Sequence, residues 1–166
     1  MRTNGEIRSM DVMVEPLPVA LDVARGTCRL LWLQGWSPLC EVTLADGHRA
    51  DIMAINARGE ILIVEIKVSA ADLLGDRKWQ HYRDFADRFA WAVPAHLAGH
   101  LEGERFAPDA CGLLVADRHE ALWVRDACET KLAPARRKAV TLAFARAGAE
   151  RALRGLDPGF DGFREW

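Results

Sequence analysis

The stretch from Arg49 to Lys67 (RADIMAINARGEILIVEIK) constrains the fold of this chain more than any other. It is typical of two strands, residues 49–56 and 61–68, joined by a tight turn over residues 57–60. The second strand is apolar at both odd and even positions until Glu65. A strand that is apolar on both faces is covered on both faces. We therefore expect a sheet with helices packed on it rather than an exposed antiparallel meander.

Three charged side chains gather at one end of this predicted hairpin. Glu65 and Lys67 are two residues apart, so they point to the same face of their strand. Asp51 opens the neighbouring strand and lies across from that end if the two strands pair. Burying two carboxylates and an ammonium is costly unless they pair with one another or hold a metal ion. The alternative is a solvated surface pair of Glu65 and Lys67, which contributes little stability.

These residue types suit a metal site for phosphate chemistry. Asp51 and Glu65 supply the carboxylates that a hard divalent cation prefers, with water and substrate phosphate completing its shell. The main-chain carbonyl of Ile66 is a candidate third oxygen ligand. Lys67 can position or deprotonate an attacking water, or stabilise charge in the transition state. The sequence therefore predicts a Mg²⁺ site, with Mn²⁺ as a substitute.

The remainder of the chain predicts one domain, residues 16–154, between a mobile N-terminal lead, residues 1–15, and a C-terminal tail, residues 155–166. Ser69 and Asp72 are suited to cap a short turn, and Asp76 to cap a helix. Gly26 is a weak point of about 1 kcal/mol relative to Ala inside the first helix. The predicted elements are helix 19–34, strands 39–45, 49–56 and 61–68, helix 77–88, strand 89–93, loop 95–110, strands 111–116 and 121–125, and helix 134–153.

Composition and charge exclude several classes of protein. A formal net charge of −2 argues against a uniformly basic coat for nucleic acid, while a local basic face is compatible with it. The N-terminal segment predicts neither a signal peptide nor an anchor, and no apolar run reaches the ~18 residues of a membrane span. The four cysteines lack the spacing of a zinc finger, and we expect reduced thiols in a cytoplasmic protein with no membrane partner. A phosphate-binding glycine loop and a serine triad are also missing from the sequence.

Several side chains are candidates for contacting DNA. For each basic side chain, the alternative is a solvated surface charge. Lys78 and Tyr82 are four residues apart and share a face of the predicted helix 77–88. Trp79 can stack on a base, but core packing is its commoner role. The start of the helix 134–153 attracts anions through its dipole. The candidates are Arg49, Arg77, Lys78, Tyr82, Arg136, Arg137 and Lys138.

The order of helix, three strands, helix and strand resembles the core of the PD-(D/E)xK nuclease superfamily, which carries an acid on its second strand and E-x-K on its third. More closely, the segments RADIMA, VEIKVSAADLLGDRKWQHY, FAWAVP and KLAPARRKAVTLAFARA resemble the MmcB-like DNA-repair family over roughly residues 20–150. The resemblance implies an α/β (α+β mixed sheet) fold. Its restriction-endonuclease-like α-β-β-β-α-β core would carry two extra strands and a C-terminal helix.

The resemblance also implies a metal-dependent endonuclease acting on DNA in bacterial repair, together with other repair proteins. By motif, Asp51 and Glu65 become metal ligands and Lys67 the catalytic lysine. Superfamily nucleases often place a further acid on the first helix. Here Glu15 precedes that helix, Asp22 lies in it, and Glu41 on the first strand is another candidate.

Two other functions are compatible with the same residues. One is a nuclease-fold protein that binds DNA or a repair partner without cutting. The other is a structural or dimerisation module in which the charges are surface pairs. Convergence of the three charged groups in a cleft would contradict the second of these, and the sequence leaves the oligomeric state open.

Overall fold

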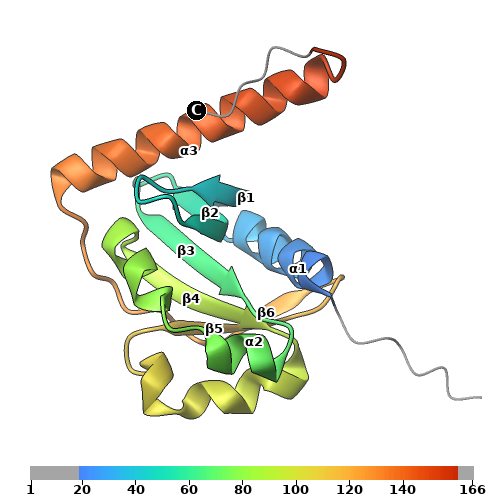
Figure 1. Ribbon diagram of the computed structural model, residues 1–166, viewed down its shortest axis with the longest axis vertical. Helices are drawn as coiled ribbons and strands as arrows, with labels where there is room; N and C mark the ends of the chain where they lie inside the picture. Colours follow the sequence, from blue (N-terminus) through green and yellow to red (C-terminus); the bar gives the residue numbers. More distant parts are fainter. Residues whose placement is uncertain (1–18, 161–166) are drawn as a thin grey trace, which may run out of the picture.

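The computed structural model describes residues 19–160, which form a six-stranded mixed sheet with helices on both faces (Figure 1). The strands lie side by side in sequence order, with β1 to β3 antiparallel, β3 to β5 parallel, and β6 antiparallel to β5. The predicted mixed α/β fold is thereby confirmed. The strands are β1 (Trp36–Thr43), β2 (Arg49–Asn56), β3 (Ile61–Ile66), β4 (Arg88–Val93), β5 (Gly112–Ala116) and β6 (Ala121–Arg125).

The helices cover the sheet unequally. α1 packs on one face, the short helices lie on the other, and the long α3 crosses the end of the sheet formed by β1 and β2 (Figure 1). None of the helices described is long and apolar enough to cross a membrane. The helices are α1 (Ala20–Leu33), α2 (Ala70–Gly75), α3 (Pro134–Leu156) and the 3₁₀ segments η1 (Trp79–Phe85), η2 (Ala95–Glu102) and η3 (Glu104–Phe106).

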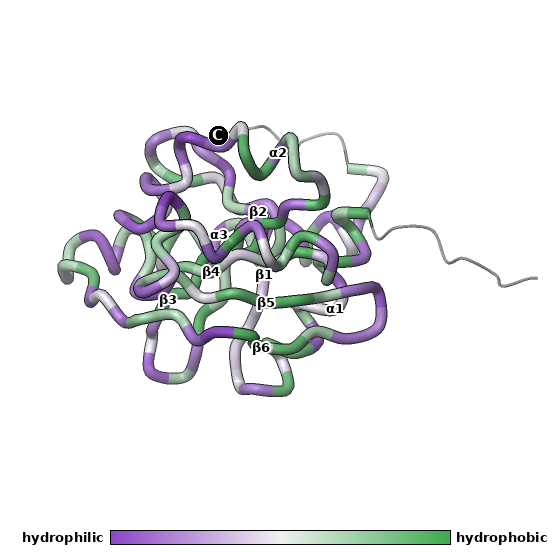
Figure 2. The backbone as a smooth tube through the Cα atoms, turned by 90° about the horizontal axis from the view of Figure 1, so that it is seen from below, coloured by the Kyte–Doolittle hydropathy of each residue, from purple (hydrophilic) through white to green (hydrophobic). Residues whose placement is uncertain are grey.

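The central strand β3 joins two hydrophobic cores. All six of its residues are buried, which confirms that both faces of this strand are covered. Its even-numbered residues pack with α1, and its odd-numbered residues Ile61 and Ile63 pack in the opposite core. There the rings of Trp79, Phe89 and Trp91 lie with their centroids 5.1–5.5 Å apart. Figure 2 shows hydrophobic residues along the central strands and hydrophilic residues in the surrounding turns.

The predicted α-helix over residues 77–88 is wrong. This part of the chain forms the 3₁₀ segment η1, whose buried residues are Trp79, Tyr82 and Phe85. A spacing of three residues matches the 3.0 residues per turn of a 3₁₀ helix, so this conformation aligns the three side chains toward the core. Because Trp79 is only 3% exposed, it packs in the core and is not available to stack on a base.

The α-helix of this region lies earlier, at α2. Its N-cap is Ser69, whose hydroxyl accepts from the backbone N–H of Asp72 at 3.2 Å, as predicted. Asp76 also caps, but it caps η1: its Oδ1 accepts from the N–H groups of Lys78 and Trp79 at 2.9 and 3.0 Å. A turn at Asp76 therefore separates two short helices where the sequence predicted one.

Other predicted boundaries differ by a few residues. β1 begins at residue 36 rather than 39, β3 ends at residue 66 rather than 68, and α3 continues to residue 156 rather than 153. The predicted loop 95–110 contains η2 and η3. The predicted lead, residues 1–15, and the end of the predicted tail, residues 161–166, lie outside the described residues.

Gly26 lies at a close contact between α1 and the turn that joins β5 to β6. A Cβ atom added there would lie 2.3 Å from the carbonyl oxygen of Asp117 and 2.4 Å from that of Glu120. Gly26→Ala is therefore expected to lower the free energy of unfolding by about 1–3 kcal/mol, because backbone atoms must move to admit the methyl group. Urea unfolding of the two proteins measures this difference.

The matched control is Gly148→Ala in α3, where the nearest atom to the added Cβ is a methyl carbon of Leu39 at 3.9 Å. With room for the methyl group, this change is expected to raise stability by about 0.5–1 kcal/mol through helix propensity alone. If Gly26→Ala stabilised the protein as Gly148→Ala does, α1 would not approach the turn this closely.

Candidate active site

Asp51 and Glu65 face each other just beyond the last paired residues of β2 and β3, Ile52 and Val64. The carboxylate of Asp51 accepts a hydrogen bond from the N–H of Ile66 at 2.8 Å. The carboxylate of Glu65 accepts one from the N–H of Asp51 at 3.2 Å. These side chains therefore continue the pairing of the two strands and fix the two carboxyl groups next to each other.

Burial makes both carboxylates hard to ionise, and the charge of Asp51 adds to this effect at Glu65. Glu65 is 3% exposed. Burial, followed by the negative charge of Asp51, raises the pKa of Glu65 to about 8, although the N–H of Asp51 and the charge of Lys67 act in the opposite direction. Burial likewise raises the pKa of Asp51. A cation at this position would relieve the repulsion between the two groups.

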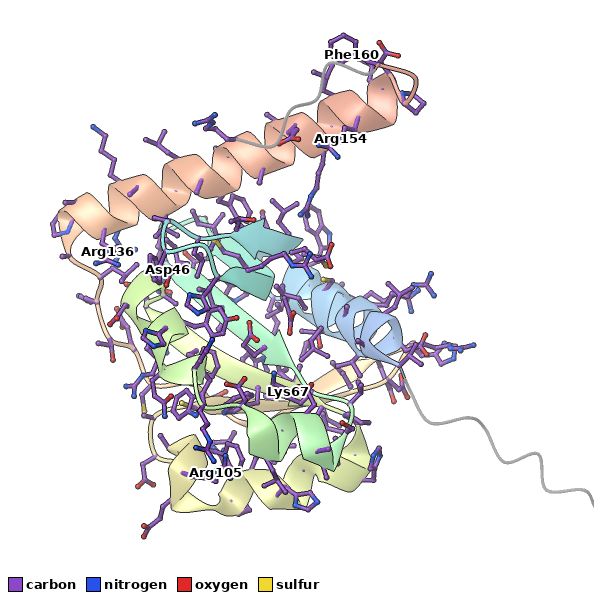
Figure 3. The ribbon with its side chains drawn as sticks, viewed as in Figure 1. Asp46, Lys67, Arg105, Arg136, Arg154 and Phe160 are labelled. Carbon is purple, nitrogen blue, oxygen red and sulfur yellow. The ribbon has the colours of Figure 1, made fainter. Side chains whose placement is uncertain are left out.

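Lys67 lies on the same side of β3 as Glu65 and is held by acids from the α2 region. Its Nζ lies 2.9 Å from Oδ2 of Asp76 and 3.7 Å from Oδ1 of Asp72, and Figure 3 shows it at the end of β3 beside α2. Burial favours the neutral amine, but the hydrogen bond and charge of Asp76, with Asp72 and Glu65, raise the pKa of Lys67 above its ordinary value. Lys67 is therefore an ammonium group, suited to donating a hydrogen bond rather than to accepting a proton.

These groups open into a cleft of about 390 Å³. The acids Glu65 and Asp76 line it together with Lys67, and the exposed Arg77 and Lys78 give it a cationic rim. The other lining residues are His48, Gly75 and Tyr82. A cleft with buried carboxylates and surrounding cations is suited to bind a phosphate group together with a metal ion.

Tyr82 and His48 form the side of the cleft that joins it to β2. Burial, followed by the charges of Glu65 and Asp51, raises the pKa of Tyr82, so its hydroxyl stays protonated. That hydroxyl donates to the carbonyl of Arg49 at 3.2 Å. The ring of His48 stacks on that of His81 with centroids 5.5 Å apart. Tyr82 thus fixes the start of β2, where Asp51 lies, against η1.

A family model described as DNA repair protein MmcB-like matches residues 16–158 of the chain. The chain belongs to this family. The MmcB-like chain also resembles a solved structure, a protein of unknown function from Silicibacter pomeroyi, with 38% sequence identity and a TM-score of 0.79. That likeness covers 92% of this chain and 100% of the other. No curated protein matches the chain.

The structure does not bring the candidate further acids of this MmcB-like chain into contact with Asp51 or Glu65. Asp22 lies at the start of α1, where its carboxylate is 3.4 Å from Nε of Arg118. Glu41 is exposed and its carboxylate is 3.4 Å from Nη2 of Arg49. Glu15 lies outside the described residues. Among residues 19–160, no group of three or more His, Cys, Asp and Glu side chains is arranged to hold a metal ion.

The candidate DNA contacts fall into two sets. Arg77, Lys78 and Tyr82 line the cleft, and Arg49 lies on β2 two residues before Asp51. The second set lies at the start of α3, where Figure 3 shows Arg136 near Asp46, away from Lys67. Only the first set adjoins the candidate active site.

Within the second set, Arg137 has a structural partner. Its two terminal nitrogens donate to the carboxylate of Asp87 at 2.7 and 2.6 Å, and Nη1 also donates to the carbonyl of Gly59 at 2.6 Å. The guanidinium of Arg136 lies 4.8 Å from the ring centroid of Phe85. Lys138 is exposed.

Sequence reasoning missed the acids that hold Lys67. Asp72 and Asp76 were interpreted only as part of helix caps, but the carboxylates of both reach the ammonium of Lys67. The sequence contained a signal for this contact. A buried lysine needs a counter-charge, and Asp72 and Asp76 are the first two acids after Lys67.

The buried position of Glu65 predicts an unusual pH dependence. The folded pKa, about 8, lies above the ordinary value of 4.5, so the folded state binds this proton more tightly than the unfolded chain does. The stabilisation that the bound proton of Glu65 gives the folded state is complete below pH 4.5 and is lost as the pH rises through 8. Glu65→Gln, which cannot ionise, should therefore match the wild type near pH 5.

Near pH 8.5, without divalent cations, the same variant should be more stable than the wild type by roughly 3–5 kcal/mol at most. Each kcal/mol is worth about 2–4 °C of melting temperature in a domain of this size. Thermal melts of both proteins from pH 5 to 8.5 in EDTA measure this. Parallel curves across the whole range would contradict a raised pKa.

Proposed function

We propose that this protein is a metal-dependent DNA endonuclease of the PD-(D/E)xK type that hydrolyses phosphodiester bonds in DNA repair. The observation that carries the proposal is a pair of adjacent carboxylates, Asp51 and Glu65, beside a cleft with a cationic rim that Glu65 and Lys67 line. Membership of a DNA repair family supports DNA as the substrate. The order of α1, β1, β2, β3, a helical segment and β4 agrees with the core of that superfamily.

The donors present fit a magnesium ion. Glu65 is buried and Asp51 partly buried, and their carboxylates repel each other. The N–H and C=O groups of a strand residue point to the same side, so the carbonyl of Ile66 faces Asp51. Mg²⁺ commonly uses one or two carboxylates and completes its shell with water and substrate phosphate. Bound there, with Mn²⁺ as a substitute, it would lower the pKa of a water molecule and neutralise phosphate charge.

Lys67 and its partners supply the remaining chemistry. As an ammonium group in the cleft, Lys67 donates a hydrogen bond to a phosphate oxygen and stabilises the charge that develops on it. Asp76 acts as a positioning residue, because its carboxylate holds Nζ at 2.9 Å. Arg77 and Lys78 attract the DNA backbone to the mouth of the cleft.

Purified protein with single-stranded, nicked and branched DNA, in Mg²⁺ or Mn²⁺, tests this function. We expect metal-dependent cleavage that EDTA stops and that Asp51→Asn abolishes, since asparagine keeps an acceptor for the N–H of Ile66 but removes the charge that would hold the metal. Glu104→Gln, which changes an exposed acid on η3, is the matched control and should cut as the wild type does. Equal cleavage by Asp51→Asn and the wild type would reject the proposal.

A second candidate function is binding of DNA or a repair partner without cutting. It is favoured by the lack of a three-donor metal group in the described part of the chain and by the engagement of Lys67 with two acids. Calorimetry separates the two functions. Salt-sensitive DNA binding with no heat from Mg²⁺ or Mn²⁺ would favour the non-cutting protein.

A further inference from the structure

Two cysteines from different elements lie within reach of each other. Cys28 on α1 and Cys40 on β1 are 12 residues apart in the chain, and their Sγ atoms are 3.7 Å apart. Both are free thiols and partly buried. A disulfide holds its sulfurs about 2.05 Å apart, so side-chain rotation over a short distance would join them.

The pair is accessible to a small oxidant. Cys28 lines a groove of about 650 Å³ that lies between α1, the start of β1 and the turn after β5, and His119 and Ala121 line its other side. Cys111, in contrast, is fully buried, and Cys128 is exposed with its thiol donating to the carbonyl of Asp109 at 3.1 Å. Cys28 and Cys40 thus lie close together and are both partly exposed, although only Cys28 lines the groove.

The surroundings give the two sulfurs different reactivity. The hydrogen bond from Cys28, helped by the positive charge of Arg151, lowers the pKa of Cys40 to about 7, although burial and the charges of Glu41 and Asp51 oppose this. The same hydrogen bond, followed by burial, raises the pKa of Cys28. This contact therefore favours the thiolate on Cys40, and a thiolate is the reactive form.

We propose that Cys28 and Cys40 are a peroxide-sensitive pair that closes to a disulfide between α1 and β1. The thiolate of Cys40 attacks one oxygen of hydrogen peroxide, which breaks the O–O bond, forms a sulfenic acid and releases hydroxide that solvent protonates to water. The thiol of Cys28 then attacks the sulfenic sulfur, which forms the S–S bond and releases a second water. In total the two thiols lose two protons and two electrons, and one peroxide becomes two waters.

Closure would lock the edge of the sheet next to the candidate active site. Cys40 pairs with Ile52, the residue after Asp51, and the following residue, Glu41, has a left-handed backbone with φ of 52°. A disulfide would tether this irregular part of β1 to α1. The modification does not require that the cleft cut DNA, so a failure of either proposal leaves the other standing.

The sequence makes the cross-link easy to detect by mass. Trypsin cleaves after Arg25, Arg29 and Arg49, so Cys28 and Cys40 fall in separate peptides, residues 26–29 and 30–49. The full chain is treated with hydrogen peroxide, alkylated and digested without reductant. We expect these two peptides joined by a disulfide in the monomer band of a non-reducing gel, and separated again after dithiothreitol.

Three variants define the roles of the sulfurs. Cys28→Ser should abolish the joined peptide and leave Cys40 as a sulfenic acid that dimedone traps. Cys40→Ser should leave Cys28 unoxidised under the same conditions, since the reactive thiolate is gone. Cys128→Ser, the matched control, should give the joined peptide in the wild-type yield.

Several results would overturn the proposal. One is wild-type protein in which Cys128 is oxidised while Cys28 and Cys40 remain alkylatable. Another is the joined peptide found only in a covalent dimer, because the link would then form between chains. If a serine variant does not fold, the peptides found in the peroxide-treated wild-type protein are enough to support or reject the proposal.

Discussion

Lys67→Met is expected to reduce the turnover of DNA cleavage by about 10²–10³-fold, the usual effect of losing one charged or hydrogen-bonding group that stabilises the transition state. Methionine keeps the length and apolar stem of lysine, so the buried part of the side chain stays filled. The ammonium that we propose donates to the phosphate is lost, and the carboxylate of Asp76 loses its partner at 2.9 Å. Single-turnover cleavage at saturating Mg²⁺ measures the effect.

Lys78→Met is the matched control, because Lys78 is exposed on the rim of the same cleft. It should weaken DNA binding and reduce the slope of log affinity against log salt concentration by about one. The turnover at saturating DNA should stay unchanged. The turnover of Asp76→Asn should lie between those of Lys67→Met and Lys78→Met, since this change loosens Lys67 without removing it. Turnover by Lys67→Met at the wild-type level would assign Lys67 a purely structural role.

Arg137→Ala is expected to lower the free energy of unfolding by about 3–5 kcal/mol, because it leaves a buried carboxylate without its counter-charge. The side chain of Asp87 is 0% exposed. It accepts from the N–H of Ile61 at 2.8 Å and from that of Leu132 at 2.9 Å, besides both nitrogens of Arg137. One carboxylate therefore joins β3, the segment before α3 and α3 itself.

The neighbouring residue provides the control for this prediction. Arg136→Ala removes an exposed guanidinium that lies 4.8 Å from the centroid of the Phe85 ring and should cost only about 0.5–1 kcal/mol. Urea unfolding at pH 7 compares both variants with the wild type. Equal, small losses from the two changes, together with weaker DNA binding by Arg137→Ala, would instead make Arg137 a phosphate contact.

The hairpin at the centre of the fold was predictable because its signals are local. The period of two along residues 61–67 places Glu65 and Lys67 on one side, and the length of the turn fixes Asp51 opposite Glu65. The burial of every residue of β3 followed from its apolar character on both faces. These features depend on neighbours in sequence, which the chain displays directly.

The features that sequence reasoning missed depend on distant partners or on a subtle period. Trp79, Tyr82 and Phe85 repeat every three residues, whereas the α-helix over residues 77–88 was predicted from the cap at Asp76. The basic run that starts α3 showed three similar charges, but only the fold reveals that Arg137 belongs to Asp87, 50 residues earlier. A charge in a sequence does not say whether its partner is solvent, a ligand or a buried acid.

The hydrogen bonds of Asp51 and Glu65 have a consequence for how such sequences change over evolutionary time. Because each carboxylate accepts from the backbone N–H of the opposing strand, the two side chains hold the end of the hairpin together whether or not any DNA is cut. A descendant that lost its chemistry would still be selected to keep an acceptor at both positions, which asparagine and glutamine also supply. Asparagine and glutamine at these positions would therefore report a hairpin preserved without its charges, whereas relatives that keep both acids together with Lys67 and Asp76 retain the groups of the proposed chemistry.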